Sequence, residues 1–262
     1  MPGEPLRDYV GALHRIQRIA PDALTEDALA AHMYSPNLAG RHYLAELRAL
    51  LATPKAKRAK NYSTMVGNAL EQVALTACFG LAGYRTLQSF QSAGPQYDLL
   101  IDGDTALWEG LISFVHSRQR RGSRILIECK ARLDSPVSDS EVSRLADLMS
   151  LNITSAGLGV FFCPAGITGR KGRSLSDGSL RQHLVLAKRN TPIIVIDNDD
   201  LDNIFQVGGF PTLLRRKIQE LEEHFASSPV GELRKVDLPR HLEESLEKCA
   251  EHSESKDTPE NE

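Results

Sequence analysis

The sequence predicts an α/β fold, in which a mixed (α+β) β-sheet carries helices on both faces and follows an N-terminal helical region. Three short strand-like segments are followed by alternating strand and helix patterns, which is typical of a mixed sheet. The last two strand segments, "GLGVFFCPAG" and "TPIIVID", are apolar throughout, so we expect both of their faces to be buried. Apolar residues make up 41% of the 262 residues, which is enough for one full core.

By pattern the chain divides into a helical region at residues 1–60, a sheet domain at residues 61–225 and a charged tail at residues 226–262. The tail ends in "EHSESKDTPENE", a composition that predicts disorder. In the first region an amphipathic segment precedes a basic run from Lys55 to Lys60. We expect a helical cap with a solvated linker here; the alternative is that the basic run contacts phosphate.

Each predicted element follows from its own periodicity. Apolar side chains recur at helical spacing over residues 63–81, where Ser63 or Thr64 could act as the N-cap. The strand segments "YRTLQSF", "YDLLID" and "RILIECKAR" come next, the last after an insertion. Helices are predicted at residues 138–152 and 201–223, and a helix or loop separates the two apolar strands between them.

Composition and charge exclude several classes of protein. The formal net charge is -3, so any contact with nucleic acid must come from a local basic patch. The four cysteines show no C-x-x-C spacing, which argues against a zinc ribbon or a disulfide framework and suits a reducing, cytoplasmic location. We expect neither a signal peptide nor a membrane span, because no apolar stretch approaches the roughly 20 residues that a span needs.

Two charged side chains share one face of the strand "RILIECKAR". Side chains alternate across a strand, so Glu128 and Lys130 project together, opposite an apolar face that includes Cys129. In "YDLLID" the same alternation sets Asp98 apart from the apolar set that contains Leu99. If the two strands pair, Asp98 can lie beside Glu128.

Two neighbouring carboxylates repel each other, and a hard divalent cation removes that cost by accepting oxygen ligands from both. The backbone carbonyl of Cys129 would face such an ion as a further ligand. Lys130 could orient or deprotonate a water, or stabilise negative charge on phosphorus. A third acid, Glu71, lies on the predicted helix among small neighbours that allow close approach.

These residues carry a family resemblance. The order of Glu71, then "YDLLI" with Asp98, then "IECK" with Glu128 and Lys130 resembles the PD-(D/E)xK nuclease superfamily. The segments "VSDSEVSRLADLMSLNITSAGLGVFFCPAGIT" and "TPIIVIDNDDLDNIF" are similar to Mrr-type restriction endonuclease domains. The resemblance covers about residues 62–221. It departs from the family pattern at Tyr97, where proline is usual, and in the long connection after the second strand.

The resemblance implies a restriction-endonuclease-like core and a Mg²⁺-dependent DNA endonuclease, with Mn²⁺ as an alternative ion. It implies that Asp98 and Glu128 bind the metal together with the Cys129 carbonyl, that Lys130 is the catalytic lysine, and that Glu71 completes the site. It further implies double-stranded DNA as substrate and restriction-type defence against foreign DNA. One site cuts one strand, so we expect a homodimer.

Two basic loops could supply the local positive surface. The insertion combines a short amphipathic helix or lid with an arginine cluster, and "GRKGRS" follows the fourth strand. Arginine forks suit phosphate oxygens; the alternative is solvated loops. The residues predicted to bind nucleic acid are Arg118, Arg120, Arg121, Arg124, Arg132, Arg170, Lys171 and Arg173.

Other interpretations remain open at this point. The chain could be a nuclease-fold enzyme that acts on RNA or branched DNA, or a catalytically silent nuclease-like module that binds nucleic acid or a partner. It could also be an α/β domain whose charges are surface accidents. We expect His116 to be a surface histidine and the Cys129 thiol to belong to the core rather than to act as a nucleophile. Residues 197–200 suit a strand end followed by a helix cap.

Overall fold

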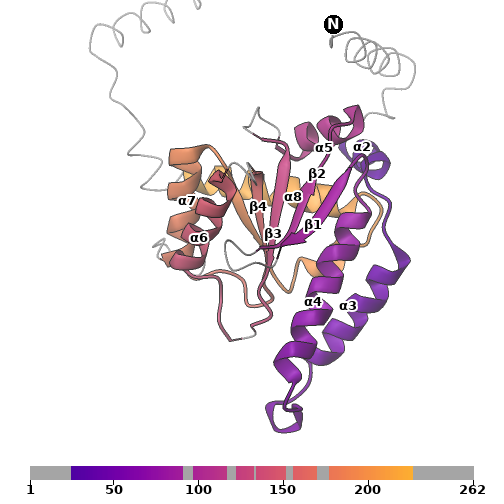
Figure 1. Cartoon of the computed structure of the whole chain (residues 1–262), viewed down its shortest axis with the longest axis vertical. Coiled ribbons are helices and arrows are strands. Elements are labelled where there is room, and N and C mark those ends of the chain that lie inside the picture. Colours follow the sequence, from indigo (N-terminus) through magenta and orange to yellow (C-terminus); the bar gives the residue numbers. More distant parts are fainter. Residues whose placement is uncertain are drawn as a thin grey trace, which may run out of the picture.

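The structure, a computed structural model, describes residues 25–90, 97–116, 122–132, 134–151, 156–169 and 177–226. Within these ranges a five-stranded mixed sheet is flanked by helices (Figure 1), which confirms the predicted α/β class. The tail predicted to be disordered lies outside the described residues from residue 227 onward. No helix in the described ranges is both long enough and apolar enough to cross a membrane.

The strands are β1 (Thr86–Phe90), β2 (Tyr97–Asp102), β3 (Arg124–Cys129), β4 (Ala156–Phe162) and β5 (Ile193–Ile196). The helices are α2 (Glu26–Met33), α3 (Leu38–Leu51), α4 (Tyr62–Phe79), α5 (Ala106–His116), α6 (Asp139–Ser150), α7 (Asp177–Arg189) and α8 (Gly209–Ala226). Two short 3-10 turns, η2 (Lys55–Lys57) and η3 (Leu201–Asn203), complete the elements of the described ranges.

The sheet follows chain order, β1-β2-β3-β4-β5. Its first three strands pair antiparallel, and β3, β4 and β5 pair parallel because α6 and α7 provide the crossovers. Strands β4 and β5 are buried along their whole length, as their continuous apolar sequences predict. The pairing of Leu99 with Ile127 sets the register between β2 and β3.

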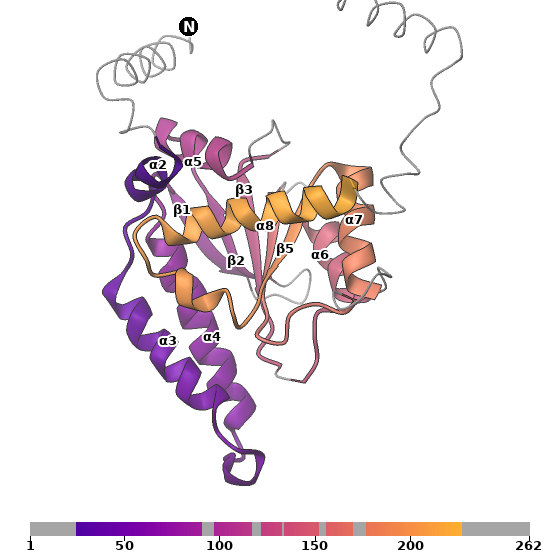
Figure 2. The same cartoon turned by 180° about the vertical axis from the view of Figure 1, so that it is seen from behind.

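The two faces of the sheet bury separate apolar cores. On one face Ile125 and Ile127 pack with residues of α4, α5 and α8, and Figure 2 shows α8 crossing this face. On the other face Leu100 and Leu126 pack with residues of α6 and α7. The strand alternation that the sequence predicts therefore directs neighbouring β3 side chains into different cores.

Two helix starts illustrate how far local sequence determines the structure. The prediction that Ser63 or Thr64 caps α4 is wrong: the helix begins after Asn61, because the turn in which Tyr62 N–H donates to the Ala59 carbonyl (3.0 Å) leads directly into it. Helix α6 begins with a capping box. The Ser138 hydroxyl accepts a hydrogen bond from the Glu141 backbone N–H, and the Glu141 carboxylate accepts one from the Ser138 backbone N–H.

The described part of the N-terminal region packs on the same core as the sheet. Ala30 of α2 and Leu47 of α3 are buried in the cluster that contains α4 and α8. Gly40 allows α3 to approach the Phe205 ring closely, since a Cβ at this position would lie 2.1 Å from Phe205 Cε1. Helices α3 and α4 form an antiparallel hairpin that extends beyond the sheet, with η2 at its tip (Figures 1 and 2). We call residues 38–79 the α3–α4 arm.

The insertion after β2 forms α5, the short amphipathic helix that its apolar spacing predicts. The expectation that His116 lies on the surface is wrong, because its side chain is only 1% exposed. The last turn of α5 packs inward, where the neighbouring Val115 is also fully buried. The last turn of α5 lies against the core, so the histidine at its end is buried although it is polar.

Candidate functional site

Asp98 and Glu128 meet at the end of the β2–β3 ladder. Because Leu99 pairs with Ile127, the antiparallel register places Asp98 across from Glu128, as the side-chain alternation predicts. Asp98 Oδ2 accepts a hydrogen bond from the backbone N–H of Cys129. The carboxylate of Asp98 thus lies where the ladder ends, close to that of Glu128.

Glu128 is a buried carboxylate with only one of its oxygens satisfied. Its side chain is 8% exposed, and Oε1 receives Lys130 Nζ at 3.0 Å together with Arg144 Nη2 from α6. The other oxygen, Oε2, is buried and has no hydrogen-bond partner among the described residues. An unsatisfied buried carboxylate oxygen is costly, so this position favours an additional cation or water.

Helix α6 adds a second carboxylate around Lys130. Lys130 Nζ lies 3.9 Å from Glu141 Oε1, and Arg132 Nη1 lies 3.8 Å from the same oxygen. Burial opposes ionisation of Glu141, but hydrogen bonds from the Ser138 backbone N–H and hydroxyl and the charges of Lys130 and Arg132 lower its pKa overall. Lys130, directly after β3, is therefore held between two carboxylates.

The surroundings of Asp98 disfavour the ionised form of its carboxyl group. Burial, together with the negative charge of Glu128, raises the pKa of Asp98, although the Cys129 N–H and the cations Lys130 and Arg144 act in the opposite direction. Ionising Asp98 in the folded protein is thus less favourable than in water. A bound divalent cation would remove both the repulsion and part of the desolvation cost.

Glu71 lies beside Asp98 but reaches it from the other face of the sheet. It is an exposed residue of α4, which packs on the face that carries α8, whereas Glu128 projects toward α6. Partial burial, followed by the charge of Asp98, raises the pKa of Glu71. Both carboxylates also act on Cys129, whose thiol has its pKa raised well above the ordinary value, first by burial. The raised pKa and the packing of Cys129 against the apolar core agree with the predicted core role.

The carboxylates therefore interact electrostatically in pairs, Glu71 with Asp98 and Asp98 with Glu128. In the part of the chain that the structure describes, no three His, Cys, Asp or Glu side chains come close enough together to hold a metal ion. The single three-acid cluster expected from the sequence is thus not formed. The Asp98–Glu128 pair by itself still fits Mg²⁺, which is commonly held by one or two carboxylates and keeps several waters.

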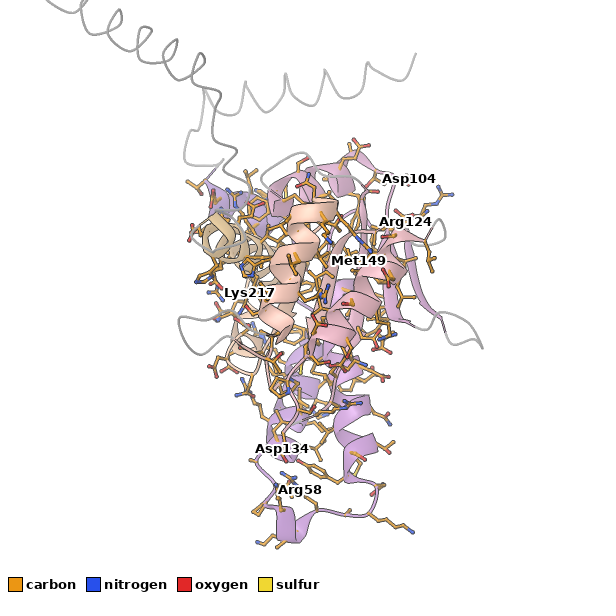
Figure 3. The ribbon with its side chains drawn as sticks, turned by 90° about the vertical axis from the view of Figure 1, so that its left-hand side faces the viewer. Arg58, Asp104, Arg124, Asp134, Met149 and Lys217 are labelled. Carbon is orange, nitrogen blue, oxygen red and sulfur yellow. The ribbon has the colours of Figure 1, made fainter. Side chains whose placement is uncertain are left out.

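Most of the predicted DNA-binding residues lie outside the described ranges: Arg118, Arg120, Arg121, Arg170, Lys171 and Arg173. Arg124 is described, and its Nε lies 2.7 Å from Asp102 Oδ2 at the start of β3. It precedes Glu128 by four residues, or about 13 Å of strand, and Figure 3 shows it far from Asp134 in the loop after β3. Arg132, by contrast, is exposed and lies close to the Lys130 network.

Two contributors to this network, Glu141 and Arg144, were not predicted from the sequence. Both are on α6, at helical spacing of three residues, and both contact charged groups that follow the apolar part of β3. The capping-box pattern "SDSE" could have located Glu141 at the start of the helix. Arg144 had no such signal, because its role depends on which face of the sheet α6 covers.

Comparison of the chain with protein-family models, with curated proteins and with solved structures gave no match. The family resemblance thus rests on the sequence motifs alone.

Proposed function

We propose that this protein is a Mg²⁺-dependent DNA endonuclease whose site contains Asp98, Glu128 and Lys130. The observation that carries the proposal is the buried, half-satisfied carboxylate of Glu128, with a second carboxylate across the ladder and the Lys130 ammonium 3.0 Å away. Carboxylate pairs with a neighbouring cation suit hydrolysis of a phosphodiester, in which negative charge develops on the phosphate.

When bound, the divalent ion would supply Lewis-acid stabilisation of the phosphate and lower the pKa of a nucleophilic water. Asp98 and Glu128 would hold the ion, and the backbone carbonyl of Cys129 is a further candidate ligand. Lys130, directly after β3, would neutralise charge on the phosphate. Glu141, whose carboxylate is fixed by the capping box, lies 3.9 Å from the Lys130 ammonium group and would help to hold it near the site.

Glu71 has a different role in this proposal. Its side chain is exposed, so it can change rotamer toward Asp98 without disturbing the core. A carboxylate at this position would accept a hydrogen bond from a water near the scissile phosphate. We assign it to positioning that water rather than to an obligatory metal ligand.

The biological part of the proposal follows from the family resemblance. A restriction-type enzyme acts on double-stranded DNA, and its defence role requires cutting both strands. Because the chain carries one such site, cleavage of a duplex on both strands calls for two copies, as in a homodimer. Mn²⁺ would also support the reaction in place of Mg²⁺, since both ions prefer oxygen ligands.

A second candidate, a catalytically silent module that binds nucleic acid, is favoured by two observations. Lys130 and Arg144 already neutralise Glu128, and the described residues contain no three-ligand metal group. Calorimetric titration with Mg²⁺ separates the two candidates, because a silent module has no need to bind the ion at Asp98 and Glu128.

The test of the proposed function is plasmid cleavage in Mg²⁺ by wild-type protein, Asp98→Ala and Lys130→Ala. We expect each substitution to reduce the cleavage rate by at least about 100-fold, because each removes a metal ligand or charge stabilisation. Asp102→Ala is the matched control, since Asp102 lies on the same strand face but at the opposite end, next to Arg124. Wild-type rates in both site variants would refute the assignment, and an RNA and branched-DNA panel would identify another substrate.

A further inference from the structure

The α3–α4 arm concentrates positive charge in a protein whose net charge is negative. Between Glu46 and Glu71 the sequence has no acidic residue, whereas the whole chain carries a formal net charge of -3. The basic residues of this stretch are Arg48, Lys55, Lys57, Arg58 and Lys60. All but Arg48 gather at the tip, around η2, where Lys55, Lys57 and Lys60 are exposed.

The tip has a defined structure. Tyr62 donates its hydroxyl hydrogen to the Leu50 carbonyl at 2.7 Å, which joins the start of α4 to the end of α3. The Arg58 guanidinium stacks over the Tyr62 ring, 4.7 Å from its centroid, and its Nε donates to the Thr53 carbonyl at 3.2 Å. These contacts fix the backbone from which the lysines project, so a bound anion would not have to order the loop.

The tip lies next to the loop that follows the candidate site. Lys55 Nζ is 3.2 Å from Asp134 Oδ2, and Asp134 follows Lys130 by only four residues. Figure 3 shows Arg58 and Asp134 at the same end of the molecule. Closer to the sheet, a Cβ at Gly67 of α4 would lie 3.8 Å from Ala131 Cβ, so the arm runs along the end of β3.

We propose that the tip of the α3–α4 arm binds the phosphate backbone of double-stranded DNA beside the candidate site. The inference rests on the proposed function, because it takes its partner from the predicted substrate. Lys60 lies two residues before α4, and the nine residue steps of α4 from Tyr62 to Glu71 span about 14 Å. At about 3.4 Å per base pair, the lysines would contact phosphates at least about four base pairs from the bond that is cut. The arm would position the duplex without reading its sequence.

The test measures how DNA binding depends on salt. Fluorescence anisotropy with a random-sequence DNA duplex in EDTA, where no cleavage occurs, gives the affinity between about 50 and 200 mM salt. The double variant Lys57→Ala/Lys60→Ala removes two exposed charges and leaves Arg58 and Tyr62 in place. Each lost phosphate contact lowers the slope of log affinity against log salt by about 0.9, so we expect a decrease of about 2.

The matched control is Arg85→Ala/Lys188→Ala, which removes two exposed positive charges that lie outside the tip of the arm. We expect its slope to equal that of the wild type within about half a contact. The substitution Asp134→Asn should change DNA affinity in the opposite direction. It removes the carboxylate that pairs with Lys55, so DNA affinity at low salt should rise.

The outcomes distinguish a failure of the arm assignment from a failure of the proposed function. If the wild type binds and cleaves DNA but Lys57→Ala/Lys60→Ala keeps the wild-type salt slope, the arm does not contact phosphate and the proposed function stands. If the wild type neither binds a DNA duplex at low salt nor cleaves plasmid in Mg²⁺, both the arm assignment and the proposed function are wrong. Tighter binding of an RNA duplex than of the DNA duplex would overturn DNA as the partner of the arm.

Discussion

At the scale of single residues, Asp98 combines a functional position with a cost in stability. Its carboxylate is half-buried and lies beside that of Glu128, and both effects raise its pKa. Its hydrogen bond from the Cys129 N–H partly offsets this cost. Sites that must bind a cation often keep such charges close together, since the ion removes the repulsion that the metal-free protein suffers.

We therefore predict that Asp98→Asn stabilises the metal-free protein at neutral pH. A folded pKa above the unfolded value means that stability is fully present below the unfolded pKa and is lost as pH rises through the folded pKa. The wild type carries this loss at neutral pH, and asparagine removes it while it still accepts the Cys129 hydrogen bond. Urea unfolding at neutral pH and near pH 3 measures the effect.

The difference between Asp98→Asn and the wild type should shrink at the acidic pH, where aspartate is protonated in both states. An Asp98→Asn protein that is less stable than the wild type at neutral pH would show that the charge of Asp98 stabilises the fold.

At the scale of elements, a buried ion pair joins the end of β5 to α8. Lys217 Nζ of α8 lies 2.6 Å from Asp200 Oδ2, and both side chains are less than one-tenth exposed. Asp200 also accepts the Asp197 backbone N–H at 3.0 Å, so the pair closes the turn that leads into η3. The sequence indicates a strand end and a cap at residues 197–200, and the structure adds the partner from α8.

We predict that Lys217→Met lowers the free energy of unfolding by about 3 kcal/mol, because it leaves a buried carboxylate with one fewer cation. Chemical denaturation monitored by circular dichroism measures the loss. Lys188→Met on α7 is the control, since this lysine is exposed and should change stability by less than about 0.5 kcal/mol. An equal effect of the two substitutions would mean that the buried pair contributes nothing specific.

At the scale of the whole molecule, the sheet separates two apolar cores and brings charged groups from three sources to the end of β3. Helix α4 contributes Glu71, strand β2 contributes Asp98, and helix α6 contributes Arg144. A cation held by Asp98 and Glu128 would join β2 to β3 only in the folded state. Binding to the native state alone stabilises it by mass action.

We predict that Mg²⁺ raises the melting temperature of the wild type but not that of Asp98→Asn/Glu128→Gln. At about 100 times the dissociation constant the stabilisation is about 2.7 kcal/mol, which corresponds to a shift of roughly 5 to 11 °C for a chain of this size. Differential scanning fluorimetry measures the shift, with potassium chloride at equal ionic strength as the control. A shift of the same size in the double variant would place the ion elsewhere.

The sequence by itself determined most helices and strands and the pairing of Asp98 with Glu128 in the candidate site. Strand alternation placed Asp98 with Glu128 and set Glu128 on the opposite face from Ile127, because the period of two is a property of the strand backbone. Helical spacing located α4, α5 and α6, and continuous apolar runs identified the two buried parallel strands. These features are encoded by neighbours within one segment, so they can be predicted without the fold.

Only the tertiary structure decided which segments meet. It placed Glu71 on the opposite face from Glu128, brought Arg144 onto Glu128, buried His116 and set Lys55 beside Asp134. These contacts join residues on elements whose relative positions depend on sheet register and on the face that each helix covers. Periodicity shows which side of a segment is apolar but carries no information on which distant segment will cover it.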